Sequence, residues 1–171
     1  MVNVKLSIKL SDIRYQDILY FFKDSNVKFS PNFIVIFDKF TYTIFRPNLK
    51  TGNIHCNITK VRSFSKVTEA LEFIKTSFPL ASIEEQSIDN ITARFEIRSK
   101  LNLDVLFRKL YNAYEIKYNL QKFPALFIKI PISNRTITIF VFTSGKIVCV
   151  GAKELLQLEL VSNWITSQIQ V

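Results

Sequence analysis

The stretch FVFTSGKIVCVGAK, residues 140–153, predicts a β-hairpin whose second strand leads directly into a helix. An aromatic, β-branched run meets the turn residues Ser144, Gly145 and Lys146, and the apolar residues IVCV follow. A similar stretch, TIFRPNLKTGNIHCNITK, lies at residues 43–60. Its glycine, cysteine and final lysine each stand 93 residues before their counterparts in the first stretch. Three matches at one offset indicate a tandem repeat of one structural unit.

The rest of the chain shows the same order of strand and helix patterns in each half. Alternating apolar residues predict strands, most clearly at residues 2–10, and apolar residues spaced i, i+3, i+4 predict helices, most clearly at 65–78. The predicted strands are 2–10, 27–29, 33–37, 41–45, 53–59, 87–97, 116–118, 126–130, 136–142 and 146–150. The predicted helices are 13–22 (with an end at 24–26), 65–78, 102–114 and 153–167.

This order, β-α-β-β-β-β-α in each half, predicts an α+β fold. Two such halves, residues 1–83 and 84–171, can join edge to edge in one curved antiparallel sheet with all four helices on its convex face. The other face of the sheet is left open, and we expect the functional residues there.

Composition limits the class of protein to which this chain can belong. With 48% hydrophobic and 22% charged residues it can bury a substantial core. A net charge of +9 favours an anionic partner such as nucleic acid. No apolar run approaches the ~18 residues of a membrane span, and the alternating start does not resemble a signal peptide. We therefore expect an intracellular protein without a membrane partner.

The inventory of reactive side chains does not favour an enzyme or a metal protein. His55 is the single histidine and has no partner at catalytic or metal-ligand spacing. Cys56 and Cys149 occupy equivalent positions in the two halves, and we expect both to be buried as small hydrophobic residues. Three glycines leave no phosphate-binding loop, and Ser144 lacks the spacing of one. We expect no catalysis, no cofactor and no small-molecule substrate.

Short motifs recur in both halves. The second half contains IDN at 88–90, KYNLQKFPALFIKI at 117–130 and FTSGKIVCVGAK at 142–153. The first half holds more diverged versions: VNV at 2–4, SPNFIVIFDK at 30–39, TIF at 43–45 and TGNIHCNITK at 51–60. In this order the motifs resemble the opening-strand, stirrup and turn signatures of the TATA-binding protein (TBP) family. The resemblance implies a two-repeat saddle that binds and bends A·T-rich DNA through the minor groove, with phenylalanine wedges that unstack base steps.

The resemblance also assigns DNA-contacting roles to particular residues. Asn3 and Asn90 would donate hydrogen bonds to base edges, because A·T pairs present only acceptors in the minor groove. The wedges would be Phe33 and Phe45 in the first half, then Phe123 (next to Pro124) and Phe142 in the second. Phe140 competes with Phe142, because the strands before the two turns differ in length by two residues. The phosphate contacts would come from Lys39, Lys122, Lys129 and Lys146.

The floor of the implied groove differs between the halves. Val148 and Val150 keep it apolar in the second half. Polar residues replace apolar floor residues elsewhere, namely Lys5, His55, Asn57 and Thr92. These replacements predict an altered sequence preference, most of all for the first half-site, either tolerance of a G·C pair or a different A·T-rich element.

Family resemblance further implies partners. They are double-stranded A·T-rich promoter DNA, a transcription factor IIB-like factor and the RNA polymerase machinery, for a general transcription initiation factor. The alternative is a protein-interaction platform in transcription that keeps the fold but has lost or altered TATA-specific DNA binding. The bias toward Ile, Lys, Asn and Phe suggests a viral or protist variant, which would act in the nucleus or in a cytoplasmic virus factory.

Overall fold

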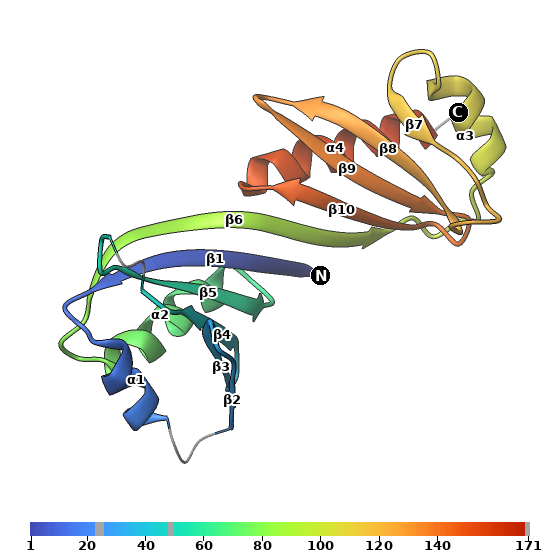
Figure 1. Cartoon of the computed structure of the whole chain (residues 1–171). Coiled ribbons are helices and arrows are strands. Elements are labelled where there is room, and N and C mark those ends of the chain that lie inside the picture. Colours follow the sequence, from blue (N-terminus) through green and yellow to red (C-terminus); the bar gives the residue numbers. More distant parts are fainter. Residues whose placement is uncertain (23–25, 48–49, 170–171) are drawn as a thin grey trace. The chain divides into compact units, whose positions relative to one another are not determined.

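The computed structural model describes residues 1–22, 26–47 and 50–169, and within these ranges it contains ten strands and four helices (Figure 1). The first half comprises β1 (Val2–Ser11), α1 (Tyr15–Phe21), β2 (Val27–Phe29), β3 (Phe33–Phe37), β4 (Thr41–Phe45), β5 (Ile54–Val61) and α2 (Ser65–Ser77). The second half comprises β6 (Ser82–Glu96), α3 (Leu103–Leu110), β7 (Glu115–Lys117), β8 (Ala125–Ile132), β9 (Arg135–Phe142), β10 (Lys146–Ala152) and α4 (Leu155–Ile169). The predicted order β-α-β-β-β-β-α, repeated once, is confirmed. Residues 24 and 25 of the predicted first helix end lie outside the described residues.

The chain divides into two compact units, Asn3–Asp89 and Asn90–Val171, the latter joined by Met1–Val2. The boundary falls inside the long strand β6. In the first unit the strand order is β2-β3-β4-β5-β1, and in the second it is β6-β10-β9-β8-β7. All strand pairs of known register within each unit are antiparallel.

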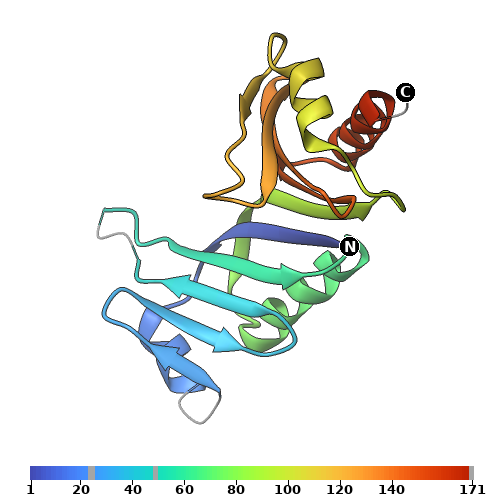
Figure 2. The same ribbon diagram turned by 90° about the vertical axis from the view of Figure 1, so that its right-hand side faces the viewer.

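In the first half both helices lie on the same side of the strands, the far side in Figure 2. Alternate residues of β1 face them and are fully buried, as the period-2 pattern predicts. Tyr42 of β4 stacks on Phe73 of α2 with ring centroids 4.5 Å apart, and its hydroxyl donates to the carbonyl oxygen of Ala70 at 3.2 Å. These contacts fix α2 on the core side and leave the opposite side of the strands to solvent.

In the second half, α4 lies behind β8, β9 and β10 (Figure 1), and α3 packs on the same core. Asn102 caps α3, its Oδ1 accepting from the amide nitrogen of Val105 at 3.1 Å. The helix ends at Leu110 and not at Tyr114 as predicted. The apolar spacing misled here because Tyr114 still faces the core from the following turn, where the indole nitrogen of Trp164 donates to its hydroxyl at 3.0 Å.

The two cysteines confirm the repeat at the level of the core. Cys56 in β5 and Cys149 in β10 are both fully buried and unpaired. Burial raises the pKa of the Cys149 thiol to about 12 and that of the Cys56 thiol further, so neither thiol is activated for redox chemistry. The structural role expected for both residues therefore fits their surroundings.

The turn before β10 requires glycine at position 145. Gly145 has φ +86°, and a Cβ atom there would lie 2.1 Å from the carbonyl oxygen of Ile97 and 2.5 Å from that of Ser99. Gly52, its counterpart in the repeat, also has a positive φ of +69°, but a Cβ atom there would meet no atom within 4 Å. A side chain at position 52 would therefore add backbone strain alone, whereas a side chain at position 145 would add both backbone strain and a steric collision.

We predict that Gly145→Ala lowers the free energy of unfolding by about 2–5 kcal/mol, the sum of left-handed strain and overpacking. The matched variant Gly52→Ala should lose only the strain, about 1–2 kcal/mol. Urea denaturation followed by the fluorescence of Trp164 measures both. Equal losses in the two variants would show that the collision at Gly145 is relieved.

Candidate nucleic-acid interface

Each half presents one strand face that no described helix covers. We call the outward side chains of the first unit the first-half face: Asn3, Lys5, Ser7, Lys9, Phe33, Val35, Phe37, Thr43, Phe45, His55 and Asn57. The second-half face consists of Asn90, Thr92, Arg94, Phe123, Phe127, Lys129, Thr138, Phe140, Phe142, Lys146, Val148 and Val150. Both follow from period-2 alternation, because every second residue of these strands is buried against the helices.

Strand register relates the two faces residue by residue. In the first half one cross-strand row runs Ser7, Asn57, Thr43, Val35 and Lys28. Asn57 and Val150 are equivalent by the 93-residue offset, so the matching row of the second half runs Thr92, Val150, Thr138, Lys129 and Glu115. The wedge and asparagine predictions can be tested against this row.

The phenylalanine pairs of the two halves do not correspond as the sequence predicts. Phe33 pairs with Phe45, and each lies two residues along its strand from the row just defined. The same step in the second half reaches Phe127 paired with Phe140. Phe140, rather than Phe142, is therefore the counterpart of Phe45, and Phe127, which the sequence analysis missed, is the counterpart of Phe33. The signal for Phe127 was available, because alternation that turns Phe123 and Lys129 outward must also turn Phe127 outward.

The second-half face carries a cluster of four phenylalanine rings. Phe140 lies 5.8 Å from Phe123 and 5.4 Å from Phe127, and Phe123 lies 6.1 Å from Phe142, measured between ring centroids. Phe142 pairs with Ala125, a small residue that leaves room for Phe123 at the end of the cluster. Phe123 is 46% exposed although it belongs to a well-packed half. Large exposed aromatic groups on a strand face mark a binding surface.

A shallow hollow lies over this aromatic cluster. Its lining combines three of the rings with basic and amide side chains: Lys117, Asn119, Lys122, Phe123, Ala125, Phe127 and Phe140. The ammonium groups of Lys117 and Lys129 lie 5.7 and 5.9 Å from the centre of the Phe127 ring. Cations beside aromatic faces suit a partner with both stacked rings and negative charge.

Two hydrogen bonds fix the orientation of the Asn90 side-chain amide and leave one of its N–H groups free to donate to a partner. Its Oδ1 accepts from the amide nitrogen of Gly151 at 2.9 Å, and its Nδ2 donates to Thr92 Oγ1 at 3.2 Å. A backbone N–H can only donate, so the orientation of the side-chain amide is fixed with oxygen inward. The second hydrogen of Nδ2 is the group that can reach an acceptor on a partner.

Asn3 does not occupy the position equivalent to Asn90. The two halves contain β-bulges at different places, at Lys60 in β5, where φ is +64°, and at Gly151 in β10, where φ is +106°. Counted from the shared row, Asn90 lies two residues beyond Thr92, and Lys5 lies two residues beyond Ser7. Lys5 therefore takes the register place of Asn90 in the first half, and the DNA contact of Asn3, which is exposed on the first-half face, stays a prediction.

The first-half face is polar where the second is aromatic and aliphatic. Lys5 Nζ lies 3.1 Å from Asp89 Oδ2, and the Ser7 hydroxyl bonds the same carboxyl oxygen and lies 2.9 Å from Asn57 Oδ1. Partial burial opposes ionisation of Asp89, but the hydrogen bond from Ser7 and the Lys5 ammonium outweigh it, so its pKa lies below the usual value. Asp89 is therefore a carboxylate at neutral pH.

The predicted phosphate-binding lysines fall into two groups. Lys129 lies on the second-half face and pairs with Glu115 at 2.9 Å, and Lys122 and Lys146 are exposed beside the aromatic cluster and the hairpin turn. Lys39 was predicted to be the counterpart of Lys129, but register gives Val35 that place. Lys39 lies in the β3–β4 turn and forms an ion pair with Glu69 of α2, on the helix side of the sheet. Lys39 therefore lies apart from the cross-strand row that contains Lys129, and its phosphate contact stays a prediction.

The remaining predicted residues lie where the alternation places them. Val148, Val150 and Thr92 are half-buried on the second-half face, and Pro124 is exposed next to Phe123. His55 is exposed on the first-half face and pairs in register with Lys9. The connection between β4 and β5 includes residues 48 and 49, which lie outside the described residues.

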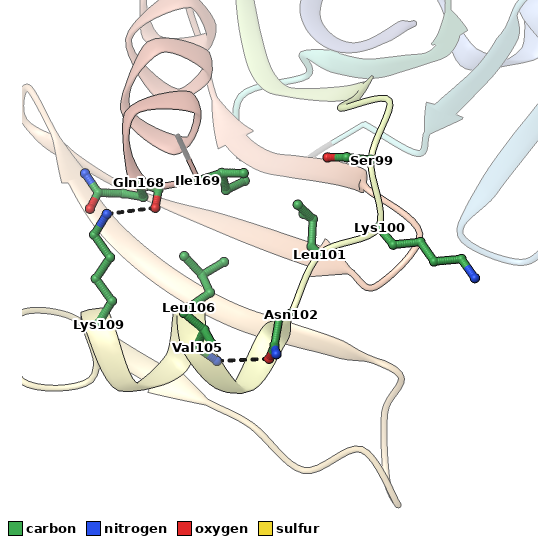
Figure 3. Close-up of a pocket in the computed structure, with 9 residues that line it drawn as sticks. All are labelled: Ser99, Lys100, Leu101, Asn102, Val105, Leu106, Lys109, Gln168 and Ile169. Carbon is green, nitrogen blue, oxygen red and sulfur yellow. Dashed lines mark hydrogen bonds between the residues drawn. The ribbon is translucent and has the colours of Figure 1, made fainter. Parts of the chain in front are cut away.

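A separate hollow lies between α3 and α4 on the helix side of the second half (Figure 3). Leu101, Leu106 and Ile169 line it, and Lys109 at its edge donates to the carbonyl oxygen of Gln168 at 2.9 Å. It contains no catalytic pair of side chains. No group of three metal-ligating residues occurs in residues 1–22, 26–47 and 50–169, and none of their helices is long and apolar enough to cross a membrane.

Comparison with known sequences identifies related proteins. A family model described as transcription factor TFIID (or TATA-binding protein, TBP) matches residues 85–170, half of the chain. The TATA-box-binding protein of Thermoplasma volcanium is 27% identical over 115 residues, which are 64% of this chain and 60% of that relative. TATA-box-binding protein-like 1 of Entamoeba histolytica is 40% identical over 75 residues, which are 44% of this chain and 32% of the relative. The chain thus spans well under the full length of these relatives.

Comparison with solved structures covers the whole chain. Methanococcus jannaschii TBP superposes with a TM-score of 0.74 over 98% of this chain and 95% of its own, at 21% sequence identity. This likeness confirms the predicted TBP-like α+β fold. Because the fold agrees along the chain and the family model matches half of its residues, the chain belongs to the TBP family.

Proposed function

We propose that this protein is a TBP-like transcription initiation factor that binds A·T-rich promoter DNA through the minor groove and bends it. The observation that carries the proposal is the composition of the second-half face. Four outward phenylalanines, an asparagine with a fixed donor and two valines share that face with flanking lysines.

The chemistry of these groups suits the minor groove of A·T pairs. That groove presents the acceptors adenine N3 and thymine O2 and no donors, which complements Nδ2 of Asn90. Val148 and Val150 offer an apolar surface to the sugar and base edges. Phenylalanine rings that insert between base steps unstack them, and the resulting bend exposes more groove to the protein.

Electrostatics favour the same partner. The net charge of +9 attracts a polyanion, and the lysines beside the aromatic cluster can contact phosphates at its edge. Each phosphate contact releases counterions, so affinity should fall steeply as salt concentration rises. The relatives named above are TATA-box-binding proteins, and we extend to this chain the role of recruiting a transcription factor IIB-like factor and the RNA polymerase machinery to the bent promoter.

One observation favours a second candidate, a protein-interaction platform with altered or lost TATA binding. The first-half face holds two lysines in ion pairs, Lys5 with Asp89 and Lys9 with Glu84, so these charges are neutralised before any phosphate approaches. A platform would use the helix side of the fold and need no wedges. A gel-shift series with A·T-rich duplexes at rising salt, with and without a IIB-like factor, separates the two. Absence of salt-sensitive binding at every sequence would leave the platform as the function.

We predict that Phe123→Ala together with Phe142→Ala abolishes DNA bending and leaves the fold intact. Phe123 is exposed and Phe142 is half-buried on the open face, so the core loses little contact. Fluorescence transfer between labelled duplex ends measures the bend. Tyr111→Ala, which removes an exposed aromatic ring directly after the C-terminal end of α3, is the control and should bend DNA normally. An unchanged bend in the double variant would refute the assignment of Phe123 and Phe142 as wedges and leave Phe127 and Phe140, the register counterparts of Phe33 and Phe45, as the candidates.

We predict that Asn90→Ala weakens DNA binding by about 1–3 kcal/mol, the usual scale for one specific base contact. Because Asn90 also accepts from Gly151, the loss could be structural, and Asn90→Asp distinguishes the causes. Aspartate keeps the acceptor for Gly151 and removes the donor. It should therefore melt like the unmodified protein, yet bind DNA at least as weakly as Asn90→Ala. Normal affinity of Asn90→Asp would mean that Asn90 serves the fold alone.

A further inference from the structure

Asp89 of β6 is not among the residues that define the first-half face, but its carboxylate reaches that face, where it contacts Lys5 and Ser7. Asp89 Oδ2 receives the Lys5 ammonium at 3.1 Å and the Ser7 hydroxyl. Its other oxygen, Oδ1, has only a long bond of 3.4 Å from the Ser87 hydroxyl among the described residues. The side chain is 29% exposed. Asp89 therefore keeps acceptor capacity that a partner on this face can use.

The donors on either side of Asp89 complete a mixed pattern. Lys5 lies on one side, and Ser7 connects Asp89 to the amide of Asn57 on the neighbouring strand. A hydroxyl has one proton, so Ser7 donates either to Asp89 or to Asn57 Oδ1, and the ionised carboxylate is the stronger acceptor. The Asn57 amide must then turn its nitrogen to Ser7 and donate to the hydroxyl oxygen. The groups left for a partner are the Lys5 ammonium as a donor, Asp89 as an acceptor and the second amide hydrogen of Asn57 as a donor.

Base pairs differ in how they meet such a pattern. The minor-groove edge of an A·T pair carries acceptors only, whereas a G·C pair adds the exocyclic N2 amine of guanine, the one donor in this groove. A carboxylate pressed against acceptors loses its water without gaining a partner, which is unfavourable. Against a G·C pair, the acceptor–donor–acceptor order of the edge complements the donor–acceptor–donor order of the protein.

The second-half face lacks this pattern at the same register positions. Ser7 and Asn57 correspond to Thr92 and Val150, and Lys5 corresponds to Asn90, so a hydroxyl, a valine side chain and an amide occupy the positions of the three residues that surround the carboxylate in the first half. The carboxylates on that side, Glu96 and Glu115, lie at the ends of their rows, and Glu115 is paired with Lys129. The first-half face therefore suits the minor-groove edge of a G·C pair, and the second-half face suits that of an A·T pair.

Resting on the proposed function, we propose that the first-half face selects a G·C base pair within an otherwise A·T-rich site. Asp89 accepts a hydrogen bond from the N2 amine of guanine, and the second half binds A·T steps. A composite site of this kind sets the direction in which the protein sits on the promoter.

The test compares base pairs that differ only by the minor-groove amine. A duplex that the protein binds is scanned by replacing each pair in turn with G·C, inosine·C, A·T or 2,6-diaminopurine·T. Inosine lacks the amine of guanine, and diaminopurine adds it to adenine. At one or two adjacent positions, G·C should bind about tenfold more tightly than inosine·C, and diaminopurine·T more tightly than A·T.

Variants then assign the preference to Asp89. Asp89→Ala should abolish or reverse it, because the freed Lys5 ammonium prefers an acceptor-only edge. Asp89→Asn, which keeps the size of the side chain, should weaken the preference while preserving the fold if alanine does not. Glu72→Ala removes an exposed carboxylate from α2 on the helix side. It should raise affinity for all duplexes alike and leave the preference unchanged.

The outcomes separate the two proposals. Equal binding of G·C and inosine·C at every position, with binding and bending otherwise present, overturns the role of Asp89 and leaves the proposed function standing. The same holds if the preference survives in both Asp89 variants. Failure of the unmodified protein to bind any duplex overturns the proposed function and this inference with it.

Discussion

Two-residue periodicity in strands that are covered on one side organises this protein. Alternate side chains of each strand enter a core of Leu, Ile and Val beneath the helices, and the residues between them must then share the opposite face. A shift of one residue would turn the core outward, so burial fixes which residues can contact a partner. In the first half, the ring stacking of Tyr42 on Phe73 and its hydrogen bond to Ala70 keep this side chain on the core side of the strand.

The same scaffold supports two chemically different faces. In the second half it displays four phenylalanine rings, two valines and a fixed asparagine donor. In the first half it displays an ion pair, a serine and an asparagine. Burial constrains the inward residues of both halves similarly, and the outward residues are free to diverge. The family model matches only the second half, whereas the fold agrees along the chain.

Much of the fold could be predicted because its signals are local. Strands β2, β3 and β4 have the predicted bounds, and Asn102 caps α3 next to an apolar periodic segment. The predicted end of α3 was wrong because Tyr114 fits the apolar spacing of the helix but lies in the turn after it. The sequence also did not reveal that the β3–β4 turn carries the side chain of Lys39 toward Glu69 on α2.

By itself, the sequence determined the repeat, the order of elements, the buried cysteines and the faces on which the outward residues lie, because each depends on spacing within one segment. Only the tertiary structure decided which outward residues stand side by side. The bulges at Lys60 and Gly151 change the register between strands far apart in the chain. These bulges place Lys5 at the position of Asn90, the pairing of β8 with β9 places Phe127 with Phe140, and a hydrogen bond holds Asp89 beside Ser7. Offsets along a sequence cannot reveal these neighbours, because a bulge of one residue alters every pairing beyond it.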